Sequence, residues 1–133
     1  MRYRNNPDYL TGLPLREDIK LYIEDRIKMG EPFHVYMVDI DYFKVINDQF
    51  GHLRGDEIIS DVAELLKHSI NEKEFVGRYG GDEFVIVVNG HRKPDEMPLR
   101  LSEQLQYREF PGEPPIKISL SFGYATYPKD GET

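Results

Sequence analysis

The sequence predicts an α/β sandwich in which helices flank a central, mostly antiparallel sheet. Segments with apolar residues at helical spacing alternate with short apolar runs, in the order helix, strand, helix, two strands, helix, strand. The two middle runs are separated by a few turn-forming residues, which is typical of a β-hairpin. The 133 residues suit one hydrophobic core, so we expect residues 1–133 to form a single domain.

The first half of the chain carries one clear strand among helices. Apolar residues recur at helical spacing from Ile19 to Ile27, and Gly30 and Pro32 end that helix. The next apolar run is nearly continuous, as in a central strand that is buried on both faces. The expected elements are a helix around residues 19–27, a strand over 33–38, a short helix over 42–50 and a longer helix over about 55–70.

The second half is expected to contain a hairpin, a weaker helix and a last strand. Gly80 and Gly81 can supply the positive φ angles that a tight turn needs. The alternation of apolar with small or polar residues from Ile116 to Tyr124 predicts a strand with one buried face. The expected elements are strands over 75–79 and 84–88, a helix over 94–106, a loop over 111–115 and a strand over 116–124.

Composition limits the classes of function. The formal charge of −7 argues against a general nucleic-acid binder, which needs surplus Lys and Arg. A phosphorylated small ligand fits if a divalent cation screens its charge from nearby carboxylates. The chain has no cysteine, no apolar run near the ~20 residues of a membrane span and no apolar signal peptide core, so we expect a cytoplasmic domain.

An acidic pair ends the central strand. Asp39 and Asp41 flank Ile40 directly after the apolar run. Carboxylates at the end of a buried strand favour a magnesium site, since oxygen ligands suit this ion. The other interpretation is that the strand simply emerges into solvent at Asp39.

Two more clusters carry polar groups suited to a nucleotide. At the hairpin, Gly80 and Gly81 would let a phosphate approach the backbone and Asp82 and Glu83 add carboxylates, although Gly-Gly-Asp is also ordinary turn chemistry.

Between the strand and the hairpin, Lys44 offers a charge for phosphate, and Asn47 and Asp56 offer acceptors for the N1–H and amine of guanine. Helix capping is the alternative role for Asn47 and Asp56.

Five segments together resemble the successive signatures of the GGDEF domain family, in the same order and at matching distances. They are residues 7–14 (PDYLTGLP), 38–48 (VDIDYFKVIND), 51–56 (GHLRGD), 78–84 (RYGGDEF) and 119–123 (SLSFG). The resemblance implies a palm-like nucleotidyl-cyclase fold. It also implies a diguanylate cyclase, which condenses two GTP into cyclic di-GMP and two pyrophosphates in bacterial second-messenger signalling.

The resemblance further implies the role of each site residue. Asp39, the carbonyl of Ile40 and Glu83 would hold Mg²⁺, for which Mn²⁺ can substitute, and Asp41 is a weaker candidate. Asp82 would lie beside the ribose 3′-hydroxyl and assist its deprotonation, which makes Asp82, Glu83 and Asp39 the catalytic set. The substrate-binding set would be Asn47 and Asp56 for guanine, Lys44 with the amides around Tyr42 and Phe43 for phosphates, and Gly80 and Gly81 for the α-phosphate and ribose.

The same family pattern implies partners and marks departures. Each domain would bind one GTP, so a homodimer is needed for catalysis. The chain stops before the family's C-terminal helix, so we expect a GGDEF domain of a longer multidomain protein with an upstream sensory domain, in the cytoplasm or on the cytoplasmic side of a membrane-anchored sensor. Asn71 and Glu74 replace the Arg and Asp of the family's inhibitory product site, which argues against feedback there. The alternative function is a non-catalytic module that binds GTP or a protein partner as a regulatory scaffold.

Overall fold

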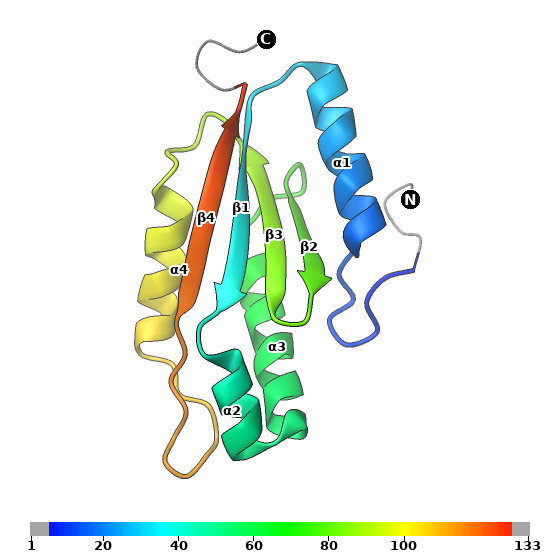
Figure 1. Ribbon diagram of the computed structural model, residues 1–133. Helices are drawn as coiled ribbons and strands as arrows, with labels where there is room; N and C mark the ends of the chain where they lie inside the picture. The colour runs from blue at the N-terminus through cyan, green and yellow to red at the C-terminus, as the bar shows by residue number, and fades with distance from the viewer. Residues whose placement is uncertain (1–5, 129–133) are drawn as a thin grey trace.

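Four strands form one sheet in the computed structural model, which describes residues 6–128 (Figure 1). The strands are β1 (Phe33–Ile40), β2 (Phe75–Gly80), β3 (Glu83–Asn89) and β4 (Leu120–Tyr127). The helices are α1 (Arg16–Met29), α2 (Phe43–Phe50), α3 (His52–Lys67) and α4 (Glu96–Gln106). The spatial order is β2-β3-β1-β4 and every neighbouring pair is antiparallel, which confirms the predicted α/β sandwich. None of the helices in this range is long and apolar enough to cross a membrane.

Helices cover both faces of the sheet. On one face, α2, α3 and α4 pack against alternate residues of β1, including Tyr36, Val38 and Ile40. On the other face, α1 packs on β2 and β3 and contributes to a smaller core with Phe33. The expectation that β1 is buried on both faces holds only at its start: on the α1 side Phe33 is buried and Val35 is half-buried, but Met37 is 42% exposed.

Helix α1 ends as expected and lies close to β2. Gly30 adopts a left-handed conformation (φ 74°), and its N–H bonds the carbonyls of Arg26 and Ile27. A Cβ at Gly77 of β2 would stand 2.5 Å from the Ile19 side chain, so this glycine permits the close contact. Helix α1 is therefore fixed against the strand that leads into the β2–β3 hairpin.

The last strand differs from the prediction. It begins at Leu120 rather than Ile116, because β1 ends at Ile40, which is the partner of Leu120. Ile116 instead forms an isolated bridge with Phe110, although its side chain is buried in the main core. Only the first part of the expected face is covered, since Tyr124 is 55% exposed.

Two further predictions were wrong in detail. Helix α3 starts at His52, three residues before the expected Gly55, and ends at Lys67. The hairpin glycines do not adopt positive φ angles, because the described glycines with positive φ are Gly12, Gly30 and Gly51. A need for positive φ angles therefore does not explain why glycines occupy positions 80 and 81.

Candidate active site

The predicted site residues gather at one end of the sheet. Strand β1 ends there, the β2–β3 turn lies beside it, and α2 begins immediately after it (Figure 1). Asp39 of β1 is the direct cross-strand partner of Glu83 of β3, so their side chains share one face of the sheet. The Ile40 N–H donates to the carbonyl of Asp82 at 3.3 Å, which ties the hairpin to the end of β1.

Negative charges crowd around Asp39. Asp39 is an exposed residue, and partial loss of water around its carboxyl group is the largest cause that raises its pKa; the charges of Asp82 and Asp41 add to it. A hydrogen bond with Glu83 acts in the opposite direction, but the net pKa stays above the usual value. A cation bound beside these groups would favour their ionised forms.

The carboxylate of Asp41 is engaged by two serines. It accepts hydrogen bonds from the Ser119 hydroxyl at 2.5 Å and from the Ser121 hydroxyl. The Asp41 N–H also donates to the Ser119 carbonyl at 2.9 Å. Asp41 therefore fastens the segment that enters β4 to the end of β1.

The donor set suits a magnesium ion held partly by its substrate. Within residues 6–128, no three or more His, Asp or Glu side chains are arranged to bind a metal on their own. Asp39 and Glu83 face each other, however, and the Ile40 carbonyl follows Asp39 directly. Magnesium is commonly bound by one or two carboxylates together with substrate phosphates, so these oxygens fit the ion.

The turn between β1 and α2 exposes backbone amides. Tyr42 has a φ of 58°, the one positive φ among the described non-glycine residues, and its side chain is 80% exposed. No side chain caps the N-terminus of α2 and its first turn has no acidic residue. The amides around Phe43 and Lys44 are thus at a helix N-terminus that favours anions, and left-handed non-glycine backbone is common at functional sites.

Asn47 and Asp56 do not cap helices. Asn47 lies inside α2, and Asp56 is the fifth residue of α3, whose N-cap is Gly51. The Asn47 Oδ1 atom is buried and finds no hydrogen-bond partner among the described residues, whereas Asp56 is exposed. The capping interpretation therefore fails for both residues.

A buried ion pair braces the hairpin from the N-terminal segment. Nη1 of Arg78 bonds both carboxylate oxygens of Asp8, at 3.0 and 2.9 Å. Asp8 also accepts from the N–H and the hydroxyl of Thr11, at 2.9 and 2.7 Å. Nε and Nη2 of the same Arg78 donate to the carbonyl of Gly81, at 3.1 and 2.8 Å. One guanidinium thus links the segment before α1 to the tip of the hairpin.

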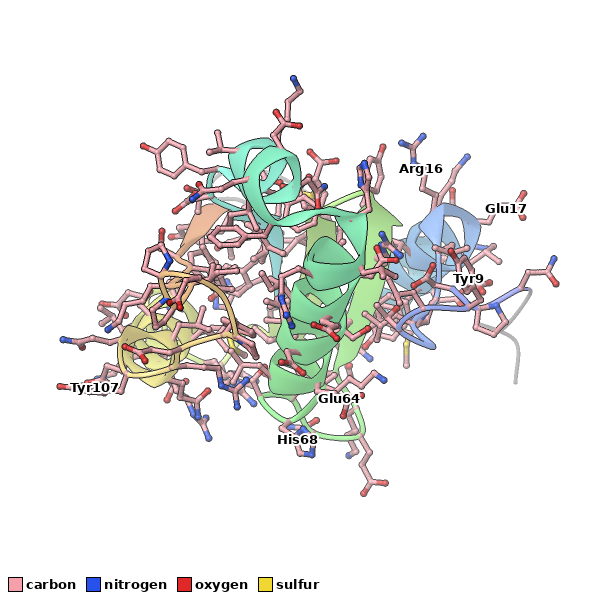
Figure 2. All side chains as sticks on the ribbon, turned by 90° about the horizontal axis from the view of Figure 1, so that it is seen from below. Tyr9, Arg16, Glu17, Glu64, His68 and Tyr107 are labelled. Atoms are coloured by element: carbon pink, nitrogen blue, oxygen red, sulfur yellow. The ribbon has the colours of Figure 1, made fainter. Side chains whose placement is uncertain are left out.

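Arg16 makes a second link to the hairpin. Its Nε donates to the carbonyl of Tyr79 at 2.9 Å, and its guanidinium lies 4.4 Å from the centre of the Tyr79 ring. Figure 2, which views the molecule from below, shows Arg16 projecting from the start of α1 on the side that also carries Tyr9. A positive charge is therefore held close to Gly80, where a Cβ would lie 3.7 Å from Nη2 of Arg16.

Comparison with known proteins identifies the family of this chain. The family model described as "Diguanylate cyclase, GGDEF domain" matches residues 5–133. The chain belongs to the GGDEF domain family.

Relatives within the GGDEF family are similar over most of this chain but are longer proteins. The chain is 33% identical to the bifunctional diguanylate cyclase/cyclic di-GMP phosphodiesterase MucR of Pseudomonas aeruginosa, over 95% of the chain and 19% of MucR. It is 41% identical to the diguanylate cyclase DgcZ of Escherichia coli, over 64% of the chain and 29% of DgcZ. The chain thus spans less than a third of either relative.

Solved structures give the same fold. A sensory box/GGDEF family protein from Caulobacter crescentus superimposes with a TM-score of 0.81 at 35% identity, covering 97% of this chain and 88% of that one. The GGDEF domain of DgcB from Caulobacter crescentus, solved in complex with c-di-GMP, gives 0.81 at 25% identity, covering 98% and 80%. The palm-like GGDEF fold expected from the sequence is therefore confirmed.

At the position of the family's inhibitory product site, this GGDEF domain has an internal ion pair. The buried carboxylate of Glu74 accepts from Nη2 of Arg92 at 2.7 Å and from the N–H groups of Asn89 and Asn71, at 3.0 and 3.1 Å. The charge of Glu74 is thus paired with Arg92 within the domain. The oxygens of Glu74 are engaged in joining the start of β2 to the end of β3.

Sequence patterns predicted the acidic and glycine residues of the site, but they missed the groups that hold them. Asp8, Thr11 and the serines beside Asp41 had no role assigned from sequence. The spacing of Asp8 and Thr11 is a local signal, because Asp and Thr three residues apart often close a turn by side-chain hydrogen bonds. The pairing of Asp8 with Arg78, 70 residues away, has no such signal.

Proposed function

We propose that this GGDEF domain is one half of a magnesium-dependent diguanylate cyclase. The observation that carries the proposal is the Asp39–Glu83 pair beside a glycine hairpin that protein packing does not require. A Cβ at Gly81 would meet nothing within 4 Å, and at Gly80 it would make only ordinary contacts. Because these glycines have neither positive φ nor crowded surroundings and also lie beside the Asp39–Glu83 pair, we attribute them to the close approach of a ligand.

The surrounding groups suit each part of GTP. Phosphate oxygens would meet Lys44 and the amides at the start of α2, where helix geometry favours anions. Guanine would meet Asn47 and Asp56, since its N1–H and amine are donors that need acceptors. An adenine edge offers an acceptor at N1, so it would face the Asp56 carboxylate without a donor there.

The reaction is a nucleotidyl transfer carried out twice. The ribose 3′-oxygen of one GTP forms a bond to the α-phosphorus of the other, the bond from that phosphorus to the bridging oxygen breaks, and pyrophosphate leaves. Asp82 would accept the proton of the 3′-hydroxyl. Bound Mg²⁺ would supply stabilisation of charge on the reacting phosphate oxygens. Asp39, the Ile40 carbonyl and Glu83 are the residues that would hold it.

Catalysis would need two domains. One GTP per domain supplies one hydroxyl and one α-phosphate, so two domains must face each other to close the ring. We propose that this domain belongs to a longer protein whose other parts bring two copies together. The small share of MucR and DgcZ that the chain spans supports a longer protein.

The test is to incubate the protein with GTP and Mg²⁺ and to measure cyclic di-GMP by liquid chromatography and mass spectrometry. We expect the rate per molecule to rise with protein concentration and to rise further when the domain is fused to a dimeric coiled coil. The Glu83→Gln variant of the fusion is the matched control. GTP binding without product in the coiled-coil fusion would favour the regulatory scaffold instead.

A further inference from the structure

We infer that Gly55 is a positioning residue for base recognition, because its missing side chain creates the space in which the Asn47 amide is seated. The inference rests on the proposed function, which places guanine at Asn47 and Asp56. Gly55 lies on α3 directly before Asp56 and is buried against α2. It thus stands where the two helices that carry the base-reading residues meet.

The contact is too close for any other residue. A Cβ built on Gly55 would lie 1.9 Å from Asn47 Oδ1 and 3.0 Å from Asn47 Cγ. The next atom is Cζ of Phe43, at 3.1 Å, which is tight but far less severe. The overlapping atoms are the end of the Asn47 side chain, which turns on two torsions, so rotating the amide out of its present position is the least costly way to relieve the overlap.

Backbone conformation does not explain this glycine. Gly55 has no positive φ, unlike Gly51 a few residues earlier, and it lies within the regular part of α3. Glycine inside a helix destabilises it relative to alanine. Gly55 therefore destabilises α3, and we attribute its presence to the space that the Asn47 amide needs.

The seated amide is poised for a ligand. Asn47 Oδ1 is buried and has no hydrogen-bond partner in the described part of the chain. A buried polar atom without a partner is destabilising, and because such atoms are rare in native structures, each one calls for an explanation. A guanine donor would satisfy this atom, so displacement of the amide should weaken guanine binding and leave binding through the phosphates intact.

The experiment compares Gly55→Ala with the wild type in Mg²⁺-dependent binding of two triphosphates that cannot release pyrophosphate, α,β-methylene GTP and α,β-methylene ATP. We expect Gly55→Ala to weaken binding of the GTP analogue at least tenfold and binding of the ATP analogue less than twofold. Asp61→Ala, an exposed change on the same helix, should alter neither affinity.

A double-mutant cycle tests whether Gly55 acts through Asn47. Asn47→Ala and the double variant Asn47→Ala/Gly55→Ala should bind the GTP analogue equally weakly, because the second change has no amide left to displace. If Gly55→Ala lowers the melting temperature, the double variant should melt at a higher temperature than Gly55→Ala, because the clash with the Asn47 amide is gone. A double variant that melts as low as Gly55→Ala would show that the clash is with Phe43 and would overturn the inference.

The two proposals fail in different ways. If the wild-type protein binds neither analogue, the proposed function itself is wrong. A wild-type protein that prefers the GTP analogue, with the same preference in Gly55→Ala, would overturn the role of Gly55 alone.

Discussion

Replacing Arg78 by alanine is expected to destabilise the domain and to disable the hairpin at the same time. The Arg78 and Asp8 side chains are 15% and 9% exposed, so the variant would leave a largely buried carboxylate without its cation. Removing one partner of a buried ion pair costs about 3–5 kcal/mol. The carbonyl of Gly81 is on an exposed residue and can be hydrated, so we take the lower end, about 3 kcal/mol.

The magnitude can be measured by urea denaturation and thermal melting. For a chain of this size, about 3 kcal/mol should lower the melting temperature by roughly 10–15 °C. Asp8→Ala and the double variant complete a cycle in which the combined loss should fall short of the sum by at least about 1 kcal/mol. Losses that add within about 0.5 kcal/mol would show that Asp8 and Arg78 are not coupled.

The catalytic consequence is separable from stability through Arg78→Lys. Lysine keeps the charge, but one ammonium cannot replace the fork that reaches Asp8 and the Gly81 carbonyl together. Cyclic di-GMP synthesis at a temperature where the variant stays folded should therefore fall, with a smaller loss of stability than in Arg78→Ala. Wild-type turnover in folded Arg78→Lys would refute the idea that this guanidinium positions the hairpin.

Three further predictions address the metal, the base and pH. Asp39→Asn and Glu83→Gln should each abolish cyclic di-GMP synthesis while circular dichroism stays native, and Asp41→Asn should lose less; unchanged synthesis in the first two would remove the metal assignment. Asp56→Ala should weaken GTP binding much more than ATP binding in calorimetry, and equal losses of affinity would show that Asp56 does not recognise the base. Burial alone would raise the pKa of Asp8, but hydrogen bonds from Thr11 and the Arg78 side chain outweigh it and hold the pKa below 3.8. That stabilisation is complete above pH 3.8 and is lost as pH falls through the lower folded pKa, so urea melts from pH 5 downward should show an acid loss that Asp8→Asn lacks.

Local patterns predicted most of the fold because they follow from how each element is buried. The apolar run of β1 and the helical spacing in α1 come from contacts that recur along one segment. The start of β4 did not follow from its alternation, because a strand extends only as far as its neighbour does, and β1 stops at Ile40. The prediction of positive φ angles at the turn was also wrong, since Gly80 and Gly81 form the hairpin without them.

The residues of the candidate site also differ in whether the nearby sequence predicts them. Asp39, Glu83 and the glycines lie in short motifs, so a role could be proposed for them from neighbouring residues. The groups that hold them are distant in sequence: Ser119 and Ser121 bond Asp41 across 78 and 80 residues. Spacing along the chain does not encode such pairs, because they depend on which strands become neighbours.

Glycines separate the parts of the molecule that serve folding from the part that we assign to a ligand. Gly30 ends a helix with a left-handed turn, and Gly77 makes room for α1, so both have a reason within the protein. Gly81 has neither reason, but Gly123 on β4 also borders open space, so a bare glycine alone does not indicate a site. What distinguishes the hairpin is that its glycines lie beside the Asp39–Glu83 pair and that Arg78 holds the Gly81 carbonyl. If the glycines are there for the ligand, Gly81→Ala should leave the melting temperature unchanged and lower the affinity for α,β-methylene GTP. A loss of stability instead would place the requirement inside the protein.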